Sequence, residues 1–281
     1  MPNIRNINAP ITLIANGRSG TSLVQSIFNN HPVFDTCGEN AAQIFGTWHA
    51  TERLKGLVRP DHALGRGADF RLRCGKAVRA VVLETFRRPG KKHWMQKPIG
   101  VPWVWWALGK QGLSEEERIK WYWQVLEYSF PEGQNITVLR HPYDVVLSAE
   151  KYWGISLEKA WVSIVRMARI LGHDSANITH AVSYDQLVQE PLGETERLFS
   201  AIDRPFSIKT LQAFERIWVP EMNTRDTALQ PDHPRFVARF SRQAEWGRLR
   251  GADFPLEERE VIIAMWRRYG VGLSLKSPCS L

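Results

Sequence analysis

Two polar segments follow apolar stretches in this sequence, and both contain residue types that bind oxyanions. The first, Asn16-Gly17-Arg18-Ser19-Gly20-Thr21-Ser22, comes directly after the apolar run 11–15. Its glycines allow close approach of the backbone to a ligand, and N–H groups at the start of a helix attract negative charge. Arg18 adds a planar fork of donors that can hold phosphate or sulfate oxygens in pairs. The pattern predicts an anion-binding turn between a strand and a helix.

This first segment also has a purely structural interpretation. A strand-to-helix turn capped by Ser19 or Thr21 would have the same composition. The segment is not a Walker A motif, because Thr21 and Ser22 follow Gly20 without the lysine that the motif requires. The other Gly-Lys pairs of the chain lack the Ser or Thr that should follow the lysine. ATP or GTP hydrolysis of the usual kind is therefore disfavoured.

The second segment is Arg140-His141-Pro142-Tyr143-Asp144, which follows the apolar run 136–139 and precedes Ser148. Pro142 suits the first turn of a helix, and Asp144 suits the positive end of the helix dipole. A guanidinium at the end of a strand and the Ser148 hydroxyl one or two helical turns later can converge on one dianion. The structural alternative makes Pro142 and Asp144 helix-start signals and Ser148 a solvated helix residue.

Taken together and in this order, the two segments resemble those of the PAPS-dependent sulfotransferases. The stretch from Arg18 to Ser22 matches the R-S-G-T-[ST] loop for the 5′-phosphosulfate, and the stretch from Arg140 to Ser148 matches the 3′-phosphate motif R-x-P-x-D-x-x-x-S. The resemblance implies that Gly17 to Ser22, Arg140 and Ser148 bind PAPS (3′-phosphoadenosine 5′-phosphosulfate). It further implies transfer of the sulfuryl group to an acceptor hydroxyl, with release of 3′,5′-ADP. The sequence contains no H-E-x-x-H motif and no Cys/His ligand set, so no metal is expected.

The same resemblance gives catalytic roles to Arg18, Glu39 and Lys97. Glu39 ends a pattern H-P-x-x-x-x-x-x-E that begins at His31, and a carboxylate at this place can take the proton from the acceptor. Lys97 looks like the family's lysine at the oxygen that bridges phosphate and sulfate. From the residues alone, Lys97 suits a solvated strand end and Glu39 a helix-start charge, while His31 is the alternative base because histidine titrates near neutrality.

The resemblance weakens toward the carboxyl terminus. Tyr184 lies in a segment similar to the family's Y-E-x-L, whose tyrosine approaches the nucleotide, although Tyr184 also suits a core aromatic with a hydrogen-bonded tip. The family usually closes a basic loop over the nucleotide, and Glu245 occupies a position where relatives often carry a basic residue. The candidates for that loop surround Trp246: Arg239, Arg242, Arg248 and Arg250.

Apolar runs alternate with helical patterns along the chain, which is typical of βα units. The patterns predict strands at 11–15, 33–36, 93–96, 136–139 and 178–183, and helices after residues 22 and 142 and at 114–129, 157–171, 194–201 and 256–269. We therefore expect an α/β protein with a three-layer P-loop-like fold, a central parallel sheet flanked by helices, and a single sulfotransferase-like domain over 1–281. Ligands of such sheets bind at the carboxyl ends of the strands. The stretch between Asn40 and Met95 has no interpretable pattern.

The composition restricts the function further. The 281 residues are 43% apolar and 23% charged, which excludes a disordered chain, and a net charge of +8 favours an anionic ligand. No block of like charges indicates a nucleic-acid-binding tail, and no secretory signal or run of about 20 apolar residues is present. Three cysteines without a C-x-x-C pair suit a reducing compartment. We expect a cytoplasmic enzyme that acts on a soluble small molecule or glycan.

Six of the twelve tryptophans lie in sequence near the predicted cofactor elements, and they are expected to pack in the core more than to stack on a sugar or an aromatic acceptor. They are Trp103, Trp105, Trp106, Trp121, Trp123 and Trp153. The alternative functions are a P-loop small-molecule kinase using ATP and a catalytically silent module that binds the nucleotide. A polynucleotide-binding protein is the remaining class for a basic chain.

Overall fold

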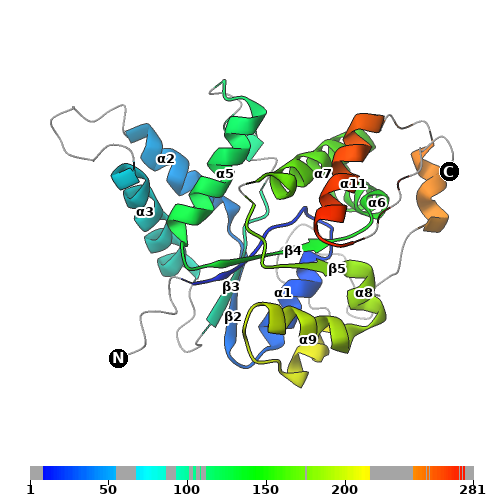
Figure 1. Ribbon diagram of the computed structural model, residues 1–281, viewed down its shortest axis with the longest axis horizontal. Coiled ribbons are helices and arrows are strands. Elements are labelled where there is room, and N and C mark those ends of the chain that lie inside the picture. Colours follow the sequence, from blue (N-terminus) through cyan, green and yellow to red (C-terminus); the bar gives the residue numbers. More distant parts are fainter. Residues whose placement is uncertain are drawn as a thin grey trace.

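The computed structural model describes residues 9–54, 68–86, 93–100, 104–105, 108, 112–174, 176–215, 243–250, 252, 254–271, 273 and 275. A parallel five-stranded sheet in the order β2-β3-β1-β4-β5 forms its centre (Figure 1). Its strands are β1 (Ile11–Leu13), β2 (Phe34–Glu39), β3 (His93–Lys97), β4 (Gln134–Leu139) and β5 (His180–Ser183). The central strand β1 pairs with β3 on one side and β4 on the other, so the loops that follow these strands meet at one edge.

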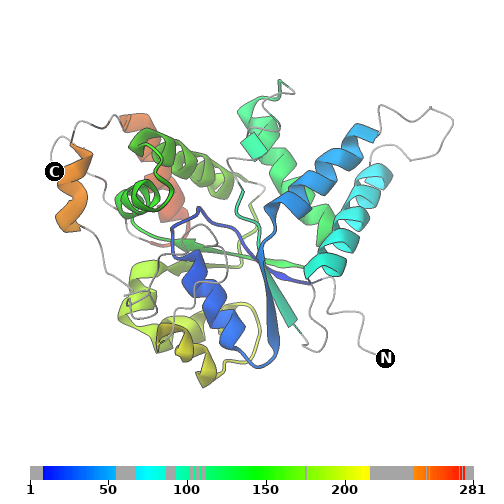
Figure 2. The ribbon, with the colours of Figure 1, turned by 180° about the vertical axis from the view of Figure 1, so that it is seen from behind.

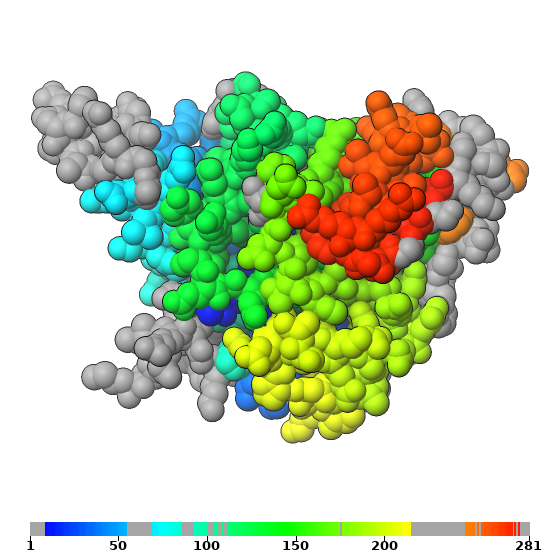
Figure 3. Space-filling view, in the orientation of Figure 1, coloured from blue at the N-terminus to red at the C-terminus, as the bar shows by residue number. Residues whose placement is uncertain are grey.

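Helices cover both faces of the sheet (Figures 1 and 2). One layer contains π-helix η2 (Ala42–Gly46), α2 (Thr47–Leu54), α3 (Ala68–Phe86), α5 (Glu115–Ser129), α6 (Pro142–Trp153), α7 (Leu157–Gly172) and α11 (Leu256–Arg268). The other contains α1 (Thr21–Asn30), α8 (Tyr184–Gln189), α9 (Pro191–Ala201), the 3₁₀ turn η3 (Ile208–Leu211) and α10 (Gln212–Glu215). The 3₁₀ segment η4 (Gln243–Leu249) packs against α6. Figure 3 shows α5, α7 and α11 at the surface of the first layer.

The sheet is apolar on both faces, because helices shield each side from water. Three of its buried polar side chains form a hydrogen-bonded ladder across three neighbouring strands: Thr12 of β1, Gln96 of β3 and Asn40 just after β2. The Asn40 amide donates to Gln96 Oε1 at 3.0 Å, and the Gln96 amide donates to Thr12 Oγ1 at 2.9 Å. All three side chains are nearly inaccessible to solvent. Since an unpaired buried amide is costly, this ladder fixes how the ends of β1, β2 and β3 align.

Local signals in the sequence set the helix ends. Ser114 forms a capping box with Glu117 at the start of α5, and Ser156 accepts a hydrogen bond from the Lys159 N–H at the start of α7. Helix α6 starts with Pro142, whose fixed φ suits the first turn. It stops at Gly154, which has a φ of 63°, a left-handed conformation that glycine adopts without strain.

The predicted α/β fold with a parallel sheet between helical layers is confirmed. The strand predicted at 178–183 begins later, at His180, and the one at 33–36 continues to Glu39. The region without a readable pattern contains η2, α2 and α3. Helix α3 carries Gly75 and charged residues along its length, which weaken the periodic apolar signal. Among the described helices, none has the length and apolar character needed to span a bilayer.

Gly75 is expected to be essential for the contact between α3 and α5. A Cβ at this position would lie 2.0 Å from the carbonyl oxygen of Tyr128, and a backbone atom cannot move aside cheaply. We expect Gly75→Ala to lower the free energy of unfolding by about 1–3 kcal/mol or more, measured by urea denaturation. The matched control is Gly172→Ala, whose Cβ would meet Met265 at an ordinary 3.9 Å. Equal stability of the two variants would contradict this account of the packing.

Candidate functional site

The loop between β1 and α1 has the backbone of an anion-binding turn. Arg18 has a φ of 71° and Gly20 a φ of 104°, so two left-handed residues bend the chain before the helix begins. Gly20 is the N-cap, and no side chain caps the helix. The Asn16 side chain holds the loop in place: its oxygen accepts a hydrogen bond from Ser163 Oγ at 2.8 Å, and its amide donates to the Gly17 carbonyl at 3.0 Å. The alternative of a turn capped by Ser19 or Thr21 is therefore wrong.

Gly20 lies directly against the ring of Tyr184. A Cβ at Gly20 would be 2.3 Å from Tyr184 Cδ2, so both the positive φ and the close contact require glycine. The Tyr184 ring is 1% exposed, and the Arg140 guanidinium carbon lies 4.5 Å from its centroid. Burial raises the pKa of Tyr184, and the Arg140 charge partly opposes this effect. Tyr184 thus supports the loop and Arg140 from the core side.

The two predicted anion-binding motifs touch each other. Arg18 Nε donates a hydrogen bond to Ser148 Oγ at 3.1 Å, and Arg140 Nη1 lies 3.4 Å from the Arg18 carbonyl oxygen, to which it donates. The Arg18 guanidinium also lies over the ring of Tyr152, 4.0 Å from its centroid. Because the loop after β1 and the start of α6 are neighbours in space, residues 130 positions apart in sequence share one site. Arg18 therefore contacts both Arg140 and Ser148, one through its backbone and the other through its side chain.

Arg140 is held by an acidic residue one helical turn later. Its Nε lies 3.9 Å from Asp144 Oδ2, close enough for an ion pair but too long for a hydrogen bond. Asp144 is fully buried, and its other oxygen accepts a hydrogen bond from Trp246 Nε1 at 2.8 Å. The Trp246 ring also stacks on His141, with centroids 4.2 Å apart. The interpretation of Asp144 as a helix-start charge alone misses these contacts, which tie η4 to the site.

Glu39 and Lys97 form an ion pair at the ends of two paired strands. The register of β2 and β3 places them side by side, after a shift between Thr36 and Glu39, and Lys97 Nζ lies 3.6 Å from Glu39 Oε1. The Lys97 side chain is 4% exposed, whereas that of Glu39 is 34% exposed. Burial lowers the pKa of Lys97, the Glu39 carboxylate opposes this, and the nearby Arg18 charge lowers it further. The alternative of a solvated strand-end lysine is wrong.

The site fits an anionic ligand in two respects. The first turn of α1 is left without a side-chain cap, so no side chain accepts from its N–H groups in place of an anion. Arg140 Nε is buried and has no hydrogen-bond acceptor within the described part of the chain. A buried guanidinium N–H without an acceptor is costly, and a phosphate oxygen would satisfy it. No group of three His, Cys, Asp or Glu side chains that could hold a metal ion occurs among the described residues.

Other sequence predictions have mixed outcomes. His31 lies at the far end of α1, where it stacks on Phe199 and its Nε2 is 2.9 Å from the Pro205 carbonyl oxygen, so it is remote from Glu39 along β2.

Trp105, Trp121 and Trp123 are buried as expected. Trp103 and Trp106 lie outside the described residues.

Trp153 contradicts the expectation that the tryptophans pack in the core. It is 48% exposed, and the ring covers Gly17, where a Cβ would be 2.4 Å from it. Tyr152, which covers Arg18, was not predicted at all and is 44% exposed. The available signal was its position four residues after Ser148, on the same side of α6.

The predicted basic loop near the carboxyl terminus is only partly described. Arg239 and Arg242 lie outside the described residues. Arg248 Nη2 lies 2.6 Å from Glu150 Oε2 on α6, and its Nη1 lies 3.8 Å from Glu245. Arg250 is exposed on the same segment. Arg248 therefore anchors η4 to α6, and Glu245 takes part in that contact.

Comparison with known proteins identifies the class. The model of the Sulfotransferase family matches residues 10–207, which include both motifs, and the chain belongs to this family. No curated protein matches the sequence. The sulfotransferase domain of the Synechococcus PCC 7002 olefin synthase has 17% identity and a TM-score of 0.53, with 94% of this chain and 96% of that chain covered. It shows that the two share a fold.

Another solved structure is similar over a smaller part. The sulfotransferase domain from the curacin biosynthetic pathway has 15% identity and a TM-score of 0.46, with 73% of this chain and 78% of that chain covered.

Removing the carboxylate of the Glu39–Lys97 ion pair is expected to lower the stability of the protein by an amount that depends on pH. The lowered pKa of Lys97 means that the unfolded chain binds this proton more tightly. The cost of burying the charge is present in full below the folded-state pKa and is relieved as the pH rises from that pKa toward the ordinary 10.5. We expect Glu39→Gln to lower the pKa of Lys97 further, because the Glu39 carboxylate raises it. We expect it to cost roughly 1–2 kcal/mol of unfolding free energy at pH 7, and less at pH 10, by urea denaturation.

The control for this prediction is Asp35→Asn, which neutralises a carboxylate earlier on the same strand. A Lys97→Met background should abolish most of the effect of Glu39→Gln, because no buried ammonium then remains. A loss that is the same at both pH values, or the same in both backgrounds, would show that the pair is not its source.

Proposed function

We propose that this sulfotransferase uses PAPS as its donor and transfers the sulfuryl group to a hydroxyl of a soluble small molecule or glycan, releasing 3′,5′-ADP. The observation that carries the proposal is the contact between the two motifs. Arg18 of the first motif donates to Ser148 of the second, and Arg140 donates to the Arg18 carbonyl. A donor with anionic groups at both its 5′ and 3′ positions would find cationic and hydrogen-bonding partners for both at this edge of the sheet.

The binding roles follow from the chemistry of these groups. The backbone from Gly17 to Ser22 and the Arg18 guanidinium would hold the 5′-phosphosulfate, since N–H groups at a helix start and a planar fork both favour oxyanions. Arg140 and the Ser148 hydroxyl would hold the 3′-phosphate, and the unsatisfied Arg140 Nε supports this assignment. Tyr184 would act through its packing against Gly20 and Arg140. When bound, PAPS supplies the sulfuryl group and 3′,5′-ADP is its leaving group.

The residues beside these motifs supply acid–base and electrostatic functions. Glu39 is accessible enough to accept the proton of an acceptor hydroxyl, whereas its partner Lys97 is buried. The Glu39 carboxylate helps to keep the Lys97 ammonium charged despite its burial. Lys97 and Arg18 would then supply fixed positive charge for the negative charge that develops on the leaving group, and such preorganised charge lowers the barrier without reorganisation. Positioning and fixed charge dominate in such group transfers, as in phosphoryl transfer.

Nucleotide binding tests the donor assignment. We expect calorimetry to show that 3′,5′-ADP binds at least tenfold more tightly than 5′-ADP, because only the former has a 3′-phosphate for Arg140 and Ser148. Arg140→Ala should abolish this preference. Arg197→Ala, which removes an exposed arginine on α9, is the matched control and should leave it unchanged. Equal affinity for the two nucleotides would favour an ATP-dependent kinase instead.

The role of Glu39 is tested separately from binding. We expect Glu39→Gln to bind 3′,5′-ADP like the unmodified protein but to transfer sulfate from PAPS about 10²–10⁴ times more slowly, because the general base is lost. Asp35→Asn is the control on the same strand and should retain its rate. Full turnover by Glu39→Gln would show that another group takes the proton. Nucleotide binding with no transfer to any hydroxyl acceptor by the unmodified protein would favour a silent module.

A further inference from the structure

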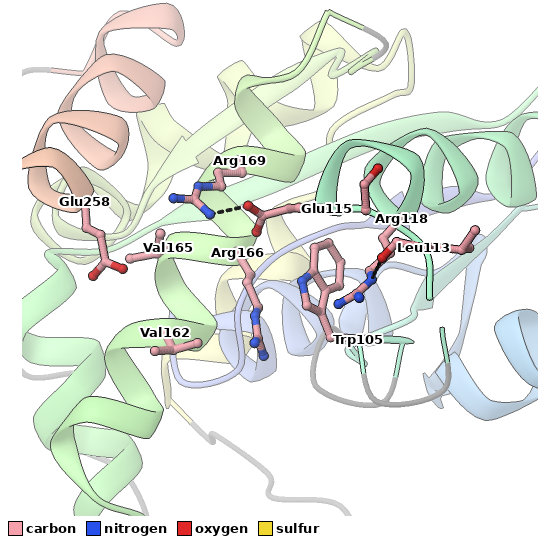
Figure 4. Close-up of a pocket in the computed structure, with 10 residues that line it drawn as sticks. Trp105, Leu113, Glu115, Arg118, Val162, Val165, Arg166, Arg169 and Glu258 are labelled. Atoms are coloured by element: carbon pink, nitrogen blue, oxygen red, sulfur yellow. Dashed lines mark hydrogen bonds and ion pairs between the residues drawn. The ribbon is translucent and has the colours of Figure 1, made fainter. Parts of the chain in front are cut away.

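A cavity of about 370 Å³ opens between α5, α7 and α11, in the helical layer opposite α1. None of its lining residues belongs to the site described above. Figure 4 shows its charged side chains reaching in from these helices, with the Trp105 ring between Arg118 and Arg166 in this view. The charged residues that line it are three arginines, Arg118, Arg166 and Arg169, and two glutamates, Glu115 and Glu258.

The two carboxylates are already engaged. Glu115 forms an ion pair with Arg169, and Glu258 accepts a hydrogen bond from Trp161 Nε1 at 2.7 Å. Among the described residues, the one hydrogen bond of the Arg118 side chain runs from its Nε to the Leu113 carbonyl oxygen at 2.8 Å. Within the described part of the chain, the Arg166 guanidinium makes neither a hydrogen bond nor a close ion pair, and its contact is with the Trp105 ring at 5.9 Å. Two arginine forks therefore line the cavity with N–H groups that have no acceptor among the described residues.

The local electrostatics agree with this geometry. Burial lowers the pKa of Arg166, the Glu115 carboxylate opposes the shift, and the charges of Arg118 and Arg169 lower the pKa further. Positive charge is thus crowded here and only partly balanced. A bound oxyanion would balance it, and a guanidinium fork holds two oxygens of one carboxylate or phosphate at once.

The remaining walls favour a flat apolar group attached to that anion. Trp105 is only 4% exposed, so its ring has a fixed position, and Val162 and Val165 of α7 line the same cavity. We propose that this cavity binds a small organic oxyanion, a carboxylate or a phosphate monoester with a flat apolar body. The charged end would lie on Arg118 and Arg166, and the body against Trp105. This site does not depend on the identity of the sulfate donor.

The test is calorimetric titration of the full chain in low-salt buffer with three probes: indole-3-acetate, phenyl phosphate and the neutral indole-3-acetamide. We expect saturable binding of at least one anion, and binding of the amide at least tenfold weaker. Arg166→Gln should weaken the binding affinity for the anion at least tenfold, which is equivalent to about 1.4 kcal/mol. Arg166→Lys should recover part of the affinity because it keeps the charge but loses the fork. Arg73→Gln, an exposed arginine on α3, is the matched control and should bind normally.

Three results would overturn the proposal. The first is no binding of either anion by the unmodified protein. The second is an affinity for the amide equal to that of indole-3-acetate, since the guanidinium groups would then have no part in binding. The third is loss of anion binding in the Arg140→Ala variant, which would show that the anion binds at the nucleotide site. Arg118→Gln provides the same test as Arg166→Gln on another helix if the latter variant does not fold.

Discussion

The close approach of the loops that follow β1 and β4 is the constraint on which the rest of the site depends. In a parallel sheet these loops leave neighbouring strands at the same edge, and here they are joined by the Arg18–Ser148 hydrogen bond. The same β1 loop also packs against the start of α8, where Gly20 has no side chain at the place that the Tyr184 ring occupies. The Tyr184 ring in turn lies under the Arg140 guanidinium, so the loop, the aromatic ring and this arginine are held together in one region.

Charge is the second constraint, because buried cations need partners. Lys97 has Glu39, and Arg140 has Asp144 and the face of Tyr184. These partners reduce the cost of burying positive charge without cancelling it, since the pKa of Lys97 remains lowered. A site with residual positive charge and open N–H donors suits a polyanionic ligand. Trp246 donates a hydrogen bond to Asp144, the partner of Arg140, and so connects the carboxyl-terminal part of the chain to this site.

The sequence indicated which residues form the candidate site better than it indicated which side chains contact and support them. The glycine pattern, Pro142 and the strand-end positions of Glu39 and Lys97 are local signals, so they could be recognised before the fold was known. The contacts of Tyr152, Trp153 and Trp246 are not local signals, because these side chains meet Arg18, Gly17 and Asp144 across the fold. Helices α2 and α3 were missed because their stability comes mainly from packing, such as the contact of Gly75 with the backbone of α5.

The sequence by itself determined the alternation of strands and helices, the start of α6 at Pro142, and two ordered oxyanion-binding motifs. Apolar periodicity and backbone restrictions of glycine and proline are properties of short segments, which is why they are readable locally. Only the tertiary structure decided that Lys97 is buried beside Glu39, and that Arg18 meets Ser148. Strand order and register bring these pairs together, and both depend on contacts between residues far apart in the chain, which no local pattern encodes.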